Sequence, residues 1–291
     1  MNIDPQIRFD YAQVGGVRLH HAIAGEGDEL VILLHGFPEC WYSWRHQLPA
    51  LSEHYTVVVP DLRGYNLSDK PSRRGSYHLD ELADDVIGLI HHFGRSKAAV
   101  IGHDWGAAIA WHIGFNHPQY LSKLGAFQVP PPSILKRNFS LRQLAASWYM
   151  FFFQLPYLPE LVLSVNDFAL LRRALKETTA ERGIIAEADI DVYKKAWAEP
   201  GALTSMLNYY RANVLGRFLG PSVSEDKIIV PTLFVYGQQD QAILPETVRG
   251  VGEMVDAPFE HFYFPQAAHW IQQEAPAEVN QLLLEFLSDS L

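Results

Sequence analysis

The chain has 291 residues, 48% of them hydrophobic, which suffices for one large α/β domain or for a core domain that carries an insertion. Its 33 acidic residues outnumber its 23 basic ones and give a formal charge of -10, which excludes electrostatic binding of nucleic acid and favours a neutral substrate. Cys40 is the only cysteine, so a disulfide framework and a cysteine-based metal cluster are also excluded.

The N-terminus and the most apolar segment both favour a cytoplasmic protein with no membrane partner. Residues 1–8 are largely polar and contain neither a basic region nor an apolar run of signal-peptide type. Residues 148–163 are the most apolar stretch, but two prolines, a glutamine and a glutamate interrupt it. It therefore falls short of the roughly 20 apolar residues of a membrane span, and we expect it to form a lid over an apolar pocket.

In chain order, the first predicted elements are short strands. Residues 9–24 contain two stretches of alternating polarity joined at Gly15-Gly16, which predicts a hairpin. Four later runs are apolar on both faces, as is typical of buried strands in a parallel sheet, at 30–34, 56–59, 98–101 and 232–236. Helices are predicted at 79–93, 105–116 and 275–287. This alternation predicts a doubly wound, mostly parallel α/β sheet.

The alternation stops near Pro130-Pro131-Pro132 and resumes near Val230-Pro231. The residues between have helical spacing, many aromatic side chains and no convincing strand pattern. We therefore predict a helical cap at residues 130–222, inserted in an α/β core formed by residues 1–129 and 223–291.

The strand at 98–101 leads into Gly102-His103-Asp104-Trp105-Gly106, where a glycine-flanked turn precedes a helix. This is the layout of the nucleophile elbow G-x-S-x-G, with an aspartate in place of the serine, which weighs against a serine esterase. A carboxylate of ordinary pKa is already charged near pH 7. Asp104 can therefore attack an electrophilic carbon without a base and form an ester that water later cleaves.

Two further residues complete a candidate triad with Asp104. Asp240 follows the strand at 232–236, and His269 follows an apolar segment at 262–264. Both are expected at the carboxyl edge of the sheet, where open α/β folds bind ligands, and they occur in the chain order nucleophile, acid, histidine. A neutral His269 can activate water for ester hydrolysis while Asp240 holds the required tautomer.

Other candidates for these roles are weaker. The strand near 124–127 offers no competing acid, because Gln128 follows it. Of the 13 histidines, His269 alone lies in a late loop before a final helix, and we expect His20 and His21 to be solvated or capping residues. The paired histidines lack carboxylate or cysteine partners at zinc-like spacing, and no G-x-G-x-x-G follows a strand, so we predict neither a metal nor a cofactor.

A loop suited to an oxyanion hole follows the strand at 30–34. In His35-Gly36-Phe37-Pro38, a glycine beside an X-Pro bond forms a tight turn whose backbone can point an amide at the site, with a cis bond possible at Phe37-Pro38. We expect the backbone N–H groups of Phe37 and Trp105 to form a two-donor oxyanion hole. For the Trp105 side chain, core packing and pocket lining both stay open.

These motifs carry a resemblance that covers nearly the whole chain. The chain resembles the epoxide hydrolase branch of the α/β-hydrolase superfamily in its motifs His35-Gly36-Phe37-Pro38-Glu39, Asp61-Leu62-Arg63-Gly64-Tyr65 with Ser68-Asp69-Lys70-Pro71, Gly102-His103-Asp104-Trp105-Gly106 and Ala268-His269-Trp270. The resemblance implies the α/β-hydrolase fold and conversion of an epoxide to a diol. Haloalkane dehalogenases look much the same at the elbow.

Cap tyrosines distinguish these two activities. Epoxide opening generates an alkoxide, a poorer leaving group than halide, and a tyrosine can donate a proton to it. The resemblance implies two such residues, and matching the segments 147–154 and 207–213 assigns them to Tyr149 and Tyr210. Helical periodicity independently places Tyr210 on an apolar stripe and turns Tyr209 away from it.

The sequence thus predicts an epoxide hydrolase that acts on a small, neutral, apolar epoxide with water as co-substrate. A haloalkane dehalogenase using the same Asp104 is the alternative, and a non-catalytic small-molecule-binding protein on the same fold is a third possibility. Fluoroacetate dehalogenases carry an arginine after the nucleophile, where this chain has Trp105. Both a monomer and a homo-oligomer remain compatible with the sequence.

Overall fold

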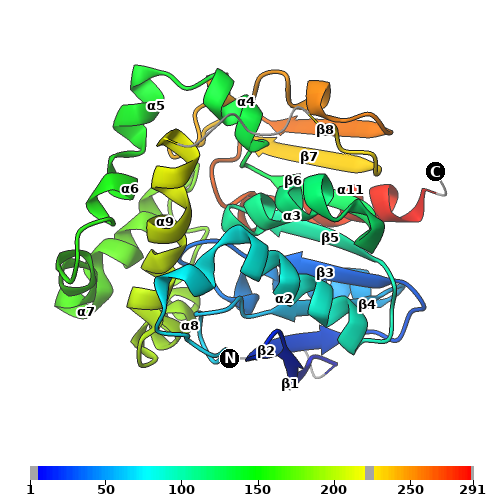
Figure 1. Ribbon diagram of the computed structural model, residues 1–291, viewed down its shortest axis with the longest axis horizontal. Helices are drawn as coiled ribbons and strands as arrows, with labels where there is room; N and C mark the ends of the chain where they lie inside the picture. The colour runs from blue at the N-terminus through cyan, green and yellow to red at the C-terminus, as the bar shows by residue number, and fades with distance from the viewer. Residues whose placement is uncertain (1–5, 220–225, 290–291) are drawn as a thin grey trace.

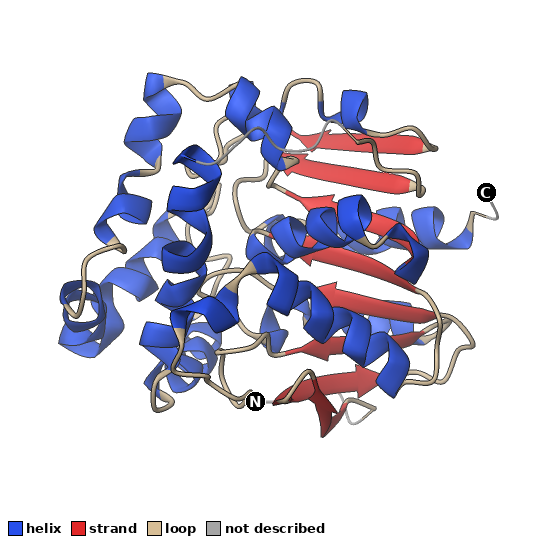
Figure 2. Ribbon diagram, in the orientation of Figure 1, coloured by secondary structure: helices blue, strands red, loops and turns tan. Residues whose placement is uncertain are grey.

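The computed structural model describes residues 6–219 and 226–289, and its centre is an eight-stranded sheet (Figures 1 and 2). The strand order is β1-β2-β4-β3-β5-β6-β7-β8; β1 and β2 run antiparallel to their neighbours, and all later pairs are parallel. The strands are β1 (Arg8–Val14), β2 (Val17–Ala24), β3 (Leu30–Leu34), β4 (Thr56–Pro60), β5 (Ala98–His103), β6 (Leu121–Phe127), β7 (Thr232–Gly237) and β8 (Phe259–Phe264).

The predicted doubly wound α/β arrangement is confirmed, because helices cover both faces of this sheet (Figure 1). On one face α2 and α3 pack together, and on the other α1 packs against α11. The helices of the core are α1 (Gln47–Ser52), α2 (Leu79–His92), α3 (Trp105–Asn116), α10 (Ile271–Glu274) and α11 (Pro276–Ser288), with 3-10 turns at Trp41–Trp44, Arg74–Tyr77, Pro118–Tyr120, Pro245–Val248 and Val251–Met254.

Local sequence explains where these elements begin and end. All residues of β3 and β5 are buried, as their uninterrupted apolar runs predict for central parallel strands. Helix α2 has acidic residues in its first turn and histidines in its last, which complements the helix dipole. Helix α3 ends just before Pro118, which cannot continue the backbone hydrogen bonds of a helix.

Between β6 and β7, every element of the described residues is a helix. These helices lie beyond the end of the sheet toward which the arrowheads of the parallel strands point (Figures 1 and 2). They are α4 (Pro132–Arg137), α5 (Leu141–Ala146), α6 (Trp148–Phe152), α7 (Leu158–Glu177), α8 (Glu187–Ala198) and α9 (Ala202–Leu219). The exact limits of the cap stay a prediction, and its expected return to the core at residue 223 lies outside the described residues.

The prediction that His20 and His21 are solvated or capping residues is wrong. Both lie on β2, which is covered by β1 and β4 on its two edges, and their side chains are buried. His20 Nδ1 lies 2.6 Å from the buried carboxylate of Asp61, and His21 packs edge-on against Phe93. A polar residue type was not sufficient to predict exposure, because position in the sheet determines it.

Candidate active site

Asp104 lies in a sharp turn between β5 and α3. Its φ of 53° is unusual for a residue with a side chain, and such strained backbone is typical of functional turns. The surrounding glycines are required by close packing: a Cβ on Gly36 would lie 2.3 Å from the Asp104 Cβ, and one on Gly106 would lie 2.2 Å from the Leu34 carbonyl oxygen. The elbow therefore brings the Asp104 carboxylate against the loop after β3.

The structure brings His269 and Asp240 to the same edge of the sheet as Asp104. His269 Nδ1 lies 2.8 Å from Asp240 Oδ2, and Asp240 Oδ1 accepts the backbone N–H groups of Ala242 and Ile243 at 2.7 and 3.0 Å. His269 Nε2 faces the elbow, 3.8 Å from Asp104 Oδ2. Asp240 thus orients the imidazole so that its other nitrogen is directed at the elbow.

The pKa of His269 is raised to about 9. Burial by itself would lower this pKa, but the hydrogen-bonded carboxylate of Asp240 and then the charge of Asp104 outweigh burial and stabilise the imidazolium. His269 is therefore charged at neutral pH while the Asp104 carboxylate carries its charge. Loss of the Asp104 charge would remove one of the groups that hold this proton.

One of the two predicted oxyanion donors contacts the carboxylate. The Phe37 backbone N–H donates to Asp104 Oδ1 at 2.9 Å, and the Phe37-Pro38 peptide bond is cis. Trp105 is the first residue of α3, but within the described ranges its backbone N–H makes no hydrogen bond to Asp104. At the helix N-terminus this N–H has no partner within its own helix.

Behind Asp104 lies a buried carboxylate, Glu39, which the sequence analysis quoted only as part of a motif. Glu39 Oε2 lies 2.9 Å from His103 Nδ1 and accepts the Gly36 N–H at 3.2 Å, while the side-chain amides of Gln272 and Gln273 donate to Oε1. Burial alone would raise the pKa of Glu39, but the neighbouring His103 lowers it overall. Glu39 therefore ties the loop after β3 to the residue before Asp104.

Gln128 is a second residue whose role the sequence did not reveal. It follows β6 with a φ of 70°, its Oε1 accepts the Gly237 N–H at 2.7 Å, and its amide donates to the Ala268 carbonyl. The side chain thereby links the loop that carries Asp240 to the loop that carries His269. Its place at the carboxyl end of a central strand was the available signal.

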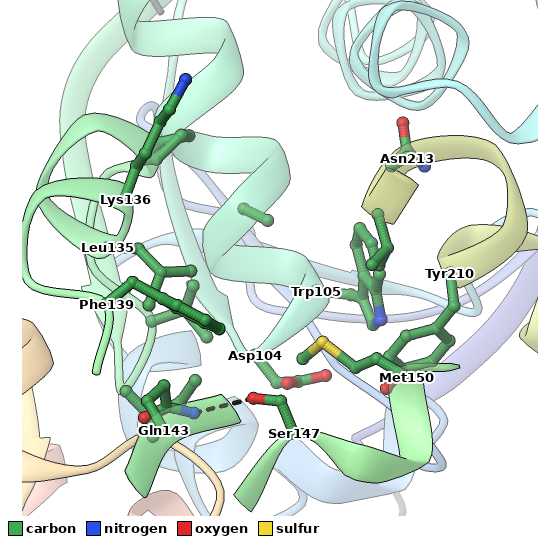
Figure 3. Close-up of a pocket in the computed structure, with 15 residues that line it drawn as sticks. Asp104, Trp105, Leu135, Lys136, Phe139, Gln143, Ser147, Met150, Tyr210 and Asn213 are labelled. Atoms are coloured by element: carbon green, nitrogen blue, oxygen red, sulfur yellow. Dashed lines mark hydrogen bonds between the residues drawn. The ribbon is translucent and has the colours of Figure 1, made fainter. Parts of the chain in front are cut away.

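Tyr210 lines the same pocket as Asp104 (Figure 3). The ring of Tyr149 lies edge-on to the Tyr210 ring, with their centroids 6.0 Å apart. Burial, followed by the charge of Asp104, raises the pKa of both phenols, so both remain protonated. Tyr209 points elsewhere, since its hydroxyl donates to the Arg63 carbonyl at 2.7 Å. Adjacent tyrosines of α9 thus have different environments.

The Trp105 side chain belongs to the pocket rather than to the core alone. Its ring lies edge-on to Tyr210 with centroids 5.1 Å apart. Figure 3 shows Asp104 between Tyr210 and Met150 on one side and Phe139 and Leu135 on the other. The pocket is lined by Asp104, Trp105, Ala108, Val129, Pro132, Leu135, Lys136, Phe139, Gln143, Ser147, Met150, Tyr210, Asn213, Val214 and Ile243.

The polar groups of this pocket are few, and one pair is bonded internally. Gln143 Nε2 donates to Ser147 Oγ at 2.9 Å, as Figure 3 shows.

In residues 6–219 and 226–289, no group of three or more histidine, cysteine, aspartate or glutamate side chains is placed to hold a metal ion. No helix within those ranges is long and apolar enough to cross a membrane.

Comparison with known proteins gives consistent matches. Residues 29–276 match the family model described as alpha/beta hydrolase fold. The chain is 42% identical over 288 residues to the AB hydrolase superfamily protein YfhM of Bacillus subtilis, covering 97% of this chain and 99% of that protein. It is 38% identical over 284 residues to Epoxide hydrolase 3 of Xenopus tropicalis, covering 94% of this chain and 76% of the relative.

A solved structure extends this likeness to three dimensions. A mutant epoxide hydrolase from Bacillus megaterium, complexed with its product (R)-3-[1]naphthyloxy-propane-1,2-diol, superposes with a TM-score of 0.88 and is 34% identical. The match covers 96% of this chain and all of that one. The cap and the core are therefore both included in the likeness.

Proposed function

This chain belongs to the epoxide hydrolases of the α/β hydrolase fold family, and we propose that it forms vicinal diols through a covalent ester on Asp104. The observation that carries this mechanism is the position of the Asp104 carboxylate, 3.8 Å from His269 Nε2 and in one pocket with Tyr210. An aspartate at an elbow supplies a nucleophile that needs no prior deprotonation.

In the first step, Asp104 attacks a ring carbon and the carbon–oxygen bond of the epoxide breaks. Tyr149 and Tyr210 donate hydrogen bonds to the departing oxygen, and one of them gives it a proton, because an alkoxide is far more basic than a phenolate. Ester formation removes the Asp104 charge and lowers the pKa of His269. The imidazolium then releases its proton through solvent, and the tyrosinate regains one.

In the second step, neutral His269 takes a proton from water as the water oxygen attacks the ester carbon. The Phe37 N–H, joined by that of Trp105, stabilises the resulting oxyanion. Collapse breaks the bond between the Asp104 carboxyl carbon and the alkyl oxygen, and the proton of the newly added hydroxyl passes to the departing alkoxide. Diol, charged Asp104 and protonated His269 result, which restores the resting state.

The lining of the pocket favours a small, neutral, apolar epoxide. Most lining side chains are apolar, and Lys136 is the only charged one besides the nucleophile among the lining residues of the described part. A haloalkane dehalogenase would bind halide through donors such as the Trp105 indole and has no need of the paired tyrosines, whereas here the Trp105 ring packs edge-on against Tyr210, whose own ring lies edge-on to Tyr149. The mutual contacts of Asp104, His269 and Asp240, at 3.8 and 2.8 Å, also weigh against a purely binding role.

Isotope labelling tests the covalent step. In a single turnover in ¹⁸O water, the first diol should contain no solvent oxygen, and the label should appear in the Asp104 side chain. Solvent oxygen found directly in the first diol would show that water attacks the epoxide itself. Asp104→Ala should form no diol, whereas Asp80→Ala, which removes an exposed carboxylate paired with His112, should retain full activity.

A substrate comparison tests the choice of electrophile. The pure protein should convert styrene oxide to its diol and release little bromide from a short bromoalkane. Bromide release without diol would reverse the assignment.

A cytoplasmic location also remains our proposal, consistent with a buried free thiol at Cys40.

A further inference from the structure

One indole of cap helix α8 reaches into the loop that carries the Phe37 amide. Trp197 is only 2% exposed, and its Nε1–H donates to the Pro38 carbonyl at 2.6 Å. The preceding residue, Phe37, donates its backbone N–H to Asp104 Oδ1 at 2.9 Å. A hydrogen bond from the cap and a hydrogen bond to the nucleophile are therefore made by adjacent residues.

The packing around Trp197 leaves its indole little freedom. Its ring stacks on Tyr193, four residues earlier on the same helix face, and also contacts Phe168 at a centroid distance of 5.8 Å. Tyr193 continues the connection, because its hydroxyl donates to Gln273 Oε1 and the Gln273 amide donates to Glu39 Oε1 at 2.8 Å. Helix α8 thus holds Pro38 directly and Glu39 through one intermediate.

Cap hydrogen bonds reach the other two loops of the site as well. Gln143 of α5 donates to the Ala242 carbonyl at 2.7 Å, in the loop after Asp240. Trp270, adjacent to His269, donates its indole N–H to Thr178 Oγ1 at 2.7 Å. The cap therefore supports the positions of the core loops in addition to covering them.

On the basis of the function proposed above, we infer that Trp197 is a positioning residue that holds the Phe37 amide against Asp104. During ester hydrolysis, negative charge develops on the Asp104 oxygen, and stabilisation requires the amide at about 2.7–3.1 Å from it. Without the indole N–H, the Pro38 carbonyl loses the hydrogen bond that the cap donates to it, and it shifts toward another hydrogen-bond donor. The amide then loses alignment in the second step, whereas ring opening, which relies on the tyrosines, changes little.

Single-turnover kinetics of Trp197→Phe with styrene oxide test this inference. Hydrolysis of the alkyl-enzyme should slow by about tenfold or more, with alkylation changed by no more than about threefold. The ester should accumulate, and KM should fall together with kcat. A merely structural role would reduce the active fraction, which lowers kcat and leaves KM and the ratio of the two rates unchanged.

Trp44→Phe is the matched control. Trp44 is also fully buried, but its Nε1 has no hydrogen-bond partner within the described ranges, so the substitution removes similar ring volume and no hydrogen bond. Its ratio of hydrolysis to alkylation should equal that of the wild type. Trp197→His, which keeps a ring N–H, should recover part of the hydrolysis rate.

If Trp197→Phe does not fold, Trp197→His is measured in its place, and its ratio of hydrolysis to alkylation should lie below that of the wild type. A wild-type ratio in the folded variant overturns the inference. This result differs from failure of the proposed function, in which the wild-type enzyme itself would form no alkyl-enzyme from epoxide.

Discussion

Replacing Asp104 by asparagine should lower the pKa of His269 well below its resting value of about 9. His269 Nε2 and Asp104 Oδ2 are 3.8 Å apart, and both side chains are largely buried. At an effective dielectric constant of about 20 to 40, two unit charges at this distance attract by about 2 to 4 kcal/mol, or about 1.5 to 3 pH units. Asparagine has nearly the same shape as aspartate and, like the proposed ester, carries no charge.

The pKa can be measured by NMR titration of protein labelled at histidine, with His269→Gln to assign the resonance among 13 histidines. Asp80→Asn serves as control, because it removes an exposed carboxylate and should leave His269 unchanged. A pKa for His269 that stays near 9 in Asp104→Asn would refute the reasoning. In that case, ester formation could not convert the imidazolium into the base that the second step requires.

Three further outcomes are expected. Tyr210→Phe should slow alkylation by about 10- to 100-fold, because ring opening loses a proton donor. Tyr209→Phe loses only a hydrogen bond to the Arg63 carbonyl and should not slow alkylation. Equal alkylation rates for Tyr210→Phe and the wild type in rapid-quench experiments would remove Tyr210 from this role. Gly36→Ala should abolish diol formation, since its Cβ would lie 2.3 Å from the nucleophile's Cβ, whereas Gly75→Ala, with nothing nearer than 3.9 Å, should be active. The folded-state pKa of His269 exceeds its ordinary 6.5, so the stability that its charge contributes is full below pH 6.5 and is lost as pH rises through about 9. Over that interval the free energy of unfolding of the wild type, measured relative to that of His269→Gln, should fall by about 3 kcal/mol. A difference between the two proteins that stays constant with pH in urea denaturation would contradict this.

Patterns within short segments were sufficient to locate the elbow. A buried strand, a glycine-flanked turn and a helix start follow one another in residues 98–106, and the structure has β5, the turn at Asp104 and α3 there. Asp240 and His269 were located by a general property of parallel sheets, whose strands all end at the same edge. Neither inference required knowledge of side-chain packing.

The side chains that hold these loops could not be predicted in this way. Gln128 was considered only as a missing carboxylate, yet it bridges the loops after β7 and β8. Glu39 is held by Gln272 and Gln273, more than 230 positions away. Hydrogen bonds between such distant segments have no periodicity or local composition that a single sequence displays.

The sequence alone was sufficient to propose Asp104 as the nucleophile, to propose the acid and the histidine in their chain order, and to predict the alternation that produces the sheet, because each inference depends on neighbouring residues or on a rule common to all parallel sheets. The tertiary structure decided how far His269 lies from the Asp104 carboxylate and that Trp197 reaches the loop beside Phe37. These properties depend on how distant segments pack, the core loops against one another and the cap over the core, because separations of a few ångströms set hydrogen bonds and pKa values.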